Sequence, residues 1–284
     1  MAIFTNQATL SYQNTTVTSN VATGELVEAL TATKTAIGNS FNADSDISYV
    51  INIINSGGNA ITGVTVSDNL GAYPFGSTTL VPLSYVDGSV RLFVNGIQQT
   101  SPTVMVGTGV VFSGITIPAG GNASLIYEAK VTDFAPLGAD GTITNTATIT
   151  GNGIATPVTV QETINTTVGP VLTISKSISP AQVTQNSQVT YTFLIQNFGN
   201  TEAAVGDNLT ITDTFNPILA GIAVALNGTP LAEGTGYAYD EATGLFTTVP
   251  GVITVPAATF TQNPVTGVWE TVPGSAVLTV TGTI

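Results

Sequence analysis

The sequence contains no cysteine and no histidine. Without them the chain cannot form disulfides, carry out Ser–His–Asp or Cys–His catalysis, or build an ordinary zinc or copper site. It also lacks a phosphate-binding loop of the GxxxxGK[ST] type, and its acidic residues show no pairing typical of glycoside hydrolases. We therefore expect no conventional enzyme, no cofactor and no bound metal, and a carboxylate-based hydrolase is the weakest of the functional alternatives.

Positive charge is also scarce. The chain has four Lys and Arg residues against 17 Asp and Glu residues, which gives a net charge of −13. Nucleic acids and anionic membranes bind basic patches, so this composition argues against both as partners. No apolar run is long enough to span a bilayer. The first residues, MAIFTNQ, lack the basic and apolar regions of a secretory signal, and we find no cell-wall sorting tail. The export route is therefore not visible in the sequence.

One pattern occurs twice along the chain. LTATKTAIGNSFNADSDISYVINIINSGG begins at Leu30, and LTISKSISPAQVTQNSQVTYTFLIQNFGN begins at Leu172. Further matches follow in order: VTVSDNL with LTITDTF, ITIPAG with ITVPAA, and NASLIYEAKV with SAVLTVTGTI. The sequence therefore predicts two copies of one module.

Each copy consists of short alternating segments separated by Gly, Pro and Asn turns, and 43% of the chain is hydrophobic. This pattern is typical of an immunoglobulin-like β-sandwich. We expect an all-β fold of two tandem Ig-like sandwiches preceded by an N-terminal donor hairpin. The expected domains are residues 1–24 for the hairpin, 25–167 for a complete sandwich, and 168–284 for a sandwich that lacks its closing hairpin.

The N-terminal segment resembles the closing strand of the first module. IFTNQATLSY, from Ile3, matches TITNTATITG, from Thr142, and TTVTSN, from Thr15, then matches TPVTVQ, from Thr156. Alternation predicts one inward-facing set of side chains on this spare strand. That set is Phe4, Asn6, Ala8, Leu10 and Tyr12.

A module without its closing hairpin exposes core side chains and an unpaired strand edge, and such edges recruit strands. Filling it would bury about four large apolar side chains at about 1.5–3 kcal/mol each. That total of about 6–12 kcal/mol is comparable to the stability of a typical domain. We expect the donor to be the N-terminal segment of another copy, which chains subunits tail to head into a filament. Two alternatives stay open: the hairpin fills the second module of its own chain, or the chain is a piece of a longer repeat protein.

Each module also points three polar residues into its core. They are Lys34, Asp68 and Asn145 in the first module, and Lys176 and Asp213 with Asn6 of another copy in the second. Burial favours a neutral lysine, which is a nucleophile, and a neighbouring carboxyl group can move protons. Attack of the amine on the carboxamide would release ammonia and leave an amide crosslink. The alternative is a plain buried Lys–Asp pair capped by Asn.

The order Lys, Asp, then Asn in a late strand resembles the Cna-type stalk domains of Gram-positive surface proteins. The phrases KSISPAQVTQNSQVTYTFLIQNFGN, LTITDTF and TNTATIT are similar to the bacterial surface repeat called domain of unknown function eleven. The resemblance implies an isopeptide bond within the chain between Lys34 and Asn145, and one between subunits joining Lys176 to Asn6. Asp68 would be the helper carboxylate for the first bond, and Asp213 for the second.

We therefore expect a structural subunit of a self-assembling fibre, located outside the cell or on a cell or spore surface, whose partners are copies of itself. The runner-up is an adhesin or stalk fragment that binds a surface ligand through its loops. Crosslinking in either module would be autocatalytic and would not make the protein an enzyme.

Overall fold

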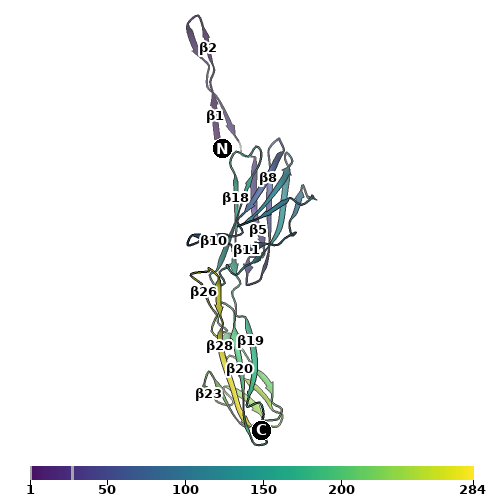
Figure 1. Ribbon diagram of the computed structural model, residues 1–284, viewed down its shortest axis with the longest axis vertical. Coiled ribbons are helices and arrows are strands. Elements are labelled where there is room, and N and C mark those ends of the chain that lie inside the picture. The colour runs from purple at the N-terminus through teal and green to yellow at the C-terminus, as the bar shows by residue number, and fades with distance from the viewer. Residues whose placement is uncertain (1, 27–28) are drawn as a thin grey trace. The chain divides into compact units, whose positions relative to one another are not determined.

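The computed structural model describes residues 2–26 and 29–284, and nearly all regular structure in them is β-strand. Contacts group the chain into two units. The first holds Met1–Thr132 and Ile143–Ile164, and the second holds Asp133–Thr142 and Asn165–Ile284. The predicted all-β fold of tandem sandwiches is confirmed (Figure 1).

The first unit has two large sheets. One has the strand order β13-β12-β16-β7-β5, with β11 also paired to β16. Its strands are β5 (Leu30–Ile37), β7 (Asp46–Asn55), β11 (Leu83–Tyr85), β12 (Arg91–Val94), β13 (Ile97–Gln98) and β16 (Asn122–Val131). The other has the order β14-β15-β8-β17-β18-β6. Its strands are β6 (Ser40–Phe41), β8 (Ile61–Asp68), β14 (Thr103–Val106), β15 (Val110–Ile117), β17 (Thr142–Thr150) and β18 (Val158–Thr166). A small hairpin, β9 (Tyr73–Phe75) and β10 (Thr78–Leu80), also belongs to this unit.

The two sheets pack face to face around one core, since the rings of Phe112 on β15 and Tyr127 on β16 lie 5.1 Å apart. Strand alternation decides which side chains enter this core. On β17 every second residue is buried, and these residues are Ile143, Asn145, Ala147 and Ile149. The strand thus closes the sandwich and carries one amide into its interior.

The second unit has one large sheet, of order β19-β20-β28-β22-β23, and a smaller one, of order β21-β25-β24. The large sheet contains β19 (Leu172–Ser179), β20 (Gln188–Asn197), β22 (Ala220–Leu226), β23 (Thr229–Leu231) and β28 (Gly274–Thr283). The smaller sheet contains β21 (Thr212–Thr214), β24 (Tyr237–Asp240) and β25 (Leu245–Thr248). A hairpin of β26 (Thr259–Gln262) and β27 (Trp269–Val272), and a 3-10 turn η1 (Val205–Asp207), lie outside these sheets.

The smaller sheets of the two units differ at one edge. In the first unit β8 lies between β15 and β17, and Asp68 on β8 is paired with Ala147 on β17. In the second unit β21 corresponds to β8 and pairs with β25, and among the described residues no strand occupies its other side. The second unit therefore lacks counterparts of β17 and β18 within the described chain.

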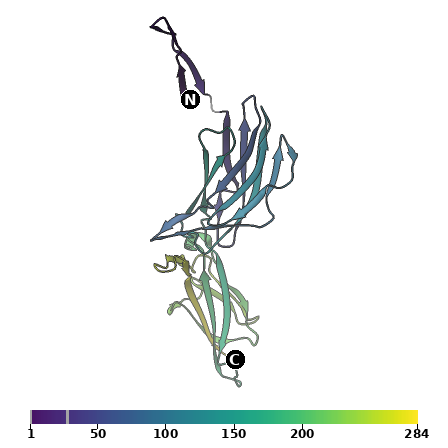
Figure 2. The ribbon, with the colours of Figure 1, turned by 45° about the horizontal axis from the view of Figure 1, so that its top comes forward.

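Near the N-terminus the chain forms an antiparallel hairpin, visible in both ribbon views (Figures 1 and 2). Strands β1 (Ala2–Asn6) and β4 (Ala22–Leu26) pair near its base, and β2 (Thr9–Tyr12) and β3 (Thr15–Thr18) pair toward its tip. The expected continuous strand from Phe4 to Tyr12 is interrupted at Gln7 and Ala8. The Gln7 amide donates to the Ser19 carbonyl at 2.8 Å, and the Ala8 N–H donates to the Ser19 hydroxyl at 3.0 Å. At these two residues, hydrogen bonds to Ser19 take the place of the regular backbone pairing between strands.

Candidate functional site

Lys34 and Asp68 form an ion pair inside the first unit. Lys34 projects from β5 and Asp68 from β8, so the pair joins the two sheets, and both side chains are fully shielded from solvent. The Lys34 Nζ also lies 4.8 Å from the centre of the Tyr49 ring, an arrangement that stabilises a cation. Burial of both partners holds the lysine in one position.

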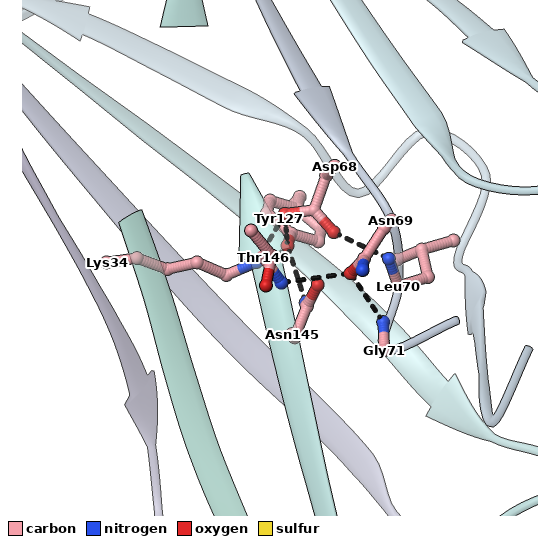
Figure 3. A network of polar contacts seen from close by, with 8 residues as sticks. All are labelled: Lys34, Asp68, Asn69, Leu70, Gly71, Tyr127, Asn145 and Thr146. Carbon is pink, nitrogen blue, oxygen red and sulfur yellow. Dashed lines mark hydrogen bonds and ion pairs between the residues drawn. The ribbon is translucent and has the colours of Figure 1, made fainter. Parts of the chain in front are cut away.

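A hydrogen-bonded chain leads from this pair to Asn145 (Figure 3). The Tyr127 hydroxyl donates to Asp68 Oδ2 at 2.6 Å and accepts a hydrogen bond from Asn145 Nδ2 at 3.2 Å. The carbonyl oxygen of Asn145 is buried without a hydrogen-bond partner among the described residues. The structure thus brings together the three predicted residues of the first module, with a tyrosine between two of them.

Burial dominates the electrostatics of this cluster. It lowers the pKa of Lys34 from 10.5 to about 8, although the Asp68 carboxylate opposes the shift. Burial also raises the pKa values of Tyr49 and Tyr127, and the Asn145 amide partly opposes this rise. The site therefore contains an amine that loses its proton more easily than in water and two hydroxyl groups that stay neutral.

The turn after β8 fixes both Asp68 and β17. The Leu70 N–H donates to Asp68 Oδ1 at 2.9 Å, and the Thr146 N–H donates to the Asn69 side chain at 2.9 Å. Gly71 follows with a φ of +75°, and a Cβ there would lie 2.5 Å from Ile143. A side chain at this position would push β17 outward, so glycine allows the Asn145 strand to approach.

The second unit has the same ion pair without an asparagine beside it. Lys176 on β19 contacts Asp213 on β21, but its side chain is 39% exposed, in contrast to Lys34. Its Nζ lies 4.5 Å from the centre of the Tyr191 ring. Among the described residues no strand supplies a counterpart of Asn145, and this absence opens the pair to solvent.

A groove lies beside this exposed pair. It has a volume of about 180 Å³ and lies between β19 and the segment that leads into β21. Its apolar lining is Leu172, Ile174, Ile195, Leu209, Ile211 and Ile253. We call these residues the acceptor groove. In the first unit the matching positions Leu30, Val64 and Val66 are buried, and Ile149 of β17 is paired directly with Val66.

The predicted donor residues are exposed in the N-terminal hairpin. Phe4 and Leu10 are 61% and 64% exposed, and Asn6, Ala8 and Tyr12 are exposed as well. Exposed aromatic and leucine side chains on a two-stranded ribbon leave much apolar surface in water.

Sequence reasoning overlooked Tyr127. The residue has the same strand phase as Ala123, Leu125 and Ala129, all of which are buried. Its position in this alternating pattern predicts that the Tyr127 side chain points into the core. A buried tyrosine hydroxyl needs a polar partner, and this need could have linked Tyr127 to Asp68 and Asn145.

No protein-family model matches the chain, and no sequence among the curated proteins matches it. The resemblance to the domain of unknown function eleven stays a prediction. No helix in the described part of the chain is long and apolar enough to cross a membrane.

Several solved structures match this chain at low sequence identity. The full-length major pilin SpaD from Corynebacterium diphtheriae is 14% identical over 58% of this chain and 41% of its own, with a TM-score of 0.37. The major pilin subunit BcpA of Bacillus cereus is 12% identical over 96% of this chain and 73% of its own, with a TM-score of 0.36. The pilus backbone RrgB from Streptococcus pneumoniae is 14% identical over 86% of this chain and 55% of its own, with a TM-score of 0.36. The chain thus spans about two fifths of SpaD and just over half of RrgB.

Proposed function

We propose that the chain is a structural subunit of an extracellular or surface fibre and polymerises head to tail by exchange of its N-terminal segment. One observation carries the proposal: no strand of the described chain covers the edge of β21 beside the acceptor groove, where the first unit has β17. The N-terminal segment resembles β17 in sequence. The chain therefore contains both an incomplete sandwich and the strand that would complete it.

The proposed seating follows from the first unit. Phe4, Asn6, Ala8 and Leu10 take the positions of Ile143, Asn145, Ala147 and Ile149, which are all buried. Leu10 then enters the acceptor groove opposite Ile211, as Ile149 lies opposite Val66. Burial of each large apolar side chain contributes about 1.5–3 kcal/mol. The contact joins two unlike surfaces, so it continues from copy to copy.

In the proposal an amide bond then seals each sandwich. In the first unit, Asp68 takes the ammonium proton of Lys34, and the neutral Nζ attacks Asn145 Cγ. The Cγ–Nδ2 bond breaks, and the nitrogen leaves as ammonia. The lowered pKa of Lys34 supports the first step. Lys176, Asp213 and the incoming Asn6 would perform the same reaction between subunits.

A deletion variant tests the assembly. A chain without residues 1–22 keeps the acceptor groove and loses the donor strand. It should stay monomeric in sedimentation velocity at concentrations where the full chain forms long polymers. Mixed with the full chain, it should accept a donor but offer none, so mean polymer length should fall as its fraction rises. A full chain that stays monomeric at every concentration contradicts the proposal and favours the adhesin or stalk alternative.

A further inference from the structure

Tyr127 lies between the acid and the amide of the first unit. Its hydroxyl contacts Asp68 Oδ2 at 2.6 Å and Asn145 Nδ2 at 3.2 Å, and it is fully buried (Figure 3). No hydrogen bond between Asp68 and Asn145 occurs in the described residues. The shortest polar route from the carboxyl group to the amide nitrogen therefore passes through this hydroxyl.

The chemistry of amide exchange requires a proton at that nitrogen. An amide is a poor leaving group, and it departs readily only when its nitrogen is protonated as the bond breaks. In the starting amide Nδ2 has no free lone pair and donates to Tyr127. Once Lys34 has attacked Cγ, the nitrogen becomes tetrahedral and gains a lone pair that can accept a proton from the same hydroxyl.

We propose that Tyr127 is a catalytic residue that relays a proton from Asp68 to the departing nitrogen of Asn145. The inference rests on the proposed crosslink. Asp68, which has taken the Lys34 ammonium proton, donates to the Tyr127 oxygen while the Tyr127 proton passes to Nδ2. Asp68, ionised again, then takes the second proton from the bonded Nζ. Ammonia leaves, the amide is neutral, and the tyrosine returns to its starting state.

A neutral hydroxyl suits this role because it donates and accepts at once. Burial keeps Tyr127 neutral by raising its pKa, and the whole side chain is shielded from solvent. The stacked Tyr49 ring, 5.6 Å away between ring centres, fixes the orientation of the Tyr127 ring.

The second unit lacks this hydroxyl. In the first unit Tyr127 is paired with Tyr49 across the sheet. At the equivalent place in the second unit, Val280 is paired with Tyr191, so a valine stands where Tyr127 would be. Tyr239 is also near the second core, but its hydroxyl is bonded to the backbone of Leu219. The bond between subunits, from Lys176 to Asn6, should therefore form more slowly than the bond within the first unit.

The test measures the rate of crosslinking by intact mass. Full chains carrying Asn6→Ala, which leaves only the first site reactive, are made by cell-free synthesis, and samples are quenched in acid over time. Tyr127→Phe keeps the ring and removes the hydroxyl. It should slow the loss of one ammonia by about 100-fold, the lower end of the effect of positioned proton transfer. Tyr85→Phe is the matched control, since Tyr85 packs against Tyr127 but its hydroxyl contacts the Val90 N–H.

The outcomes separate the relay from the crosslink. If the Asn6→Ala chain loses no ammonia, both the crosslink and the relay are wrong. The proposal of strand exchange does not depend on this result. Ammonia loss at an equal rate in the Tyr127→Phe chain overturns the relay alone. If Tyr127→Phe does not fold by circular dichroism, 3-fluorotyrosine at position 127 keeps the shape and changes the acidity of the hydroxyl. A relay then changes the rate severalfold, and an unchanged rate contradicts it.

Discussion

At the scale of single residues, the same ion pair has two different environments in one chain. Lys34 and Asp68 are shielded from solvent, whereas Lys176 and Asp213 are partly exposed. The difference comes from β17, which covers the first pair and has no counterpart beside the second among the described residues. Reactivity of the lysine should therefore follow the presence of a closing strand rather than the pair itself.

In an Asn145→Ala chain Lys34 stays unreacted, and the free energy of unfolding should depend on the pKa of Lys34. Its pKa is about 8 in the folded state against 10.5 in the unfolded chain. Between these values the unfolded state binds more protons, so the free energy of unfolding rises with pH. The cost of the buried ammonium is about 3 kcal/mol below pH 8, and most of it should disappear by about pH 10.

Urea unfolding of this variant from about pH 7 to about pH 11, followed by near-ultraviolet circular dichroism of the first-unit tyrosines, measures the slope. A Lys34→Met, Asn145→Ala chain is the control and should lack the rise. Above about pH 10 stability should fall in both chains, because the raised pKa values of Tyr49 and Tyr127 make the unfolded state lose protons first. A flat profile in both chains up to pH 10 would show that the Lys34 pKa is unperturbed.

At the scale of elements, the proposed assembly depends on the edge of β21 that no strand covers in the described chain. Alternation along the chain predicted which residues of β5, β8 and β17 face inward, because side chains of a strand alternate between its faces. It could not predict the interruption at Gln7 and Ala8, which depends on bonds to Ser19 across the hairpin. The partners of Tyr127 were missed for a related reason, since they come from strands far apart in sequence.

The element-scale prediction compares two neighbouring residues of the donor strand. Leu10→Asp would place a carboxylate in the acceptor groove, whose lining contains no cationic residue, and should abolish polymer formation at micromolar concentration. Ser11→Asp, one residue on, faces outward like Thr150 of β17 and should polymerise like the parent chain. Light scattering of both variants provides the measurement. Equal loss of assembly in both would point to a general charge effect instead of seating in the groove.

At the scale of the whole molecule, strand exchange and covalent bonding are separate properties of the proposed fibre. Strand exchange depends on packing in the acceptor groove, whereas the bond depends on one carboxamide that reaches Lys176. The sequence predicted both from the repeat of β17 near the N-terminus.

Asn6→Ala separates them. Alanine keeps the small inward position of the donor strand and removes the electrophile, so polymers should still sediment under native conditions. Boiled in detergent, the parent chain should give a ladder of bands, and Asn6→Ala should give a monomer. That monomer should still be lighter by one ammonia, because the Lys34–Asn145 site is untouched. A ladder that persists in Asn6→Ala would place the intersubunit bond on another residue, and loss of native polymers would mean that the bond, not strand packing, holds the copies together.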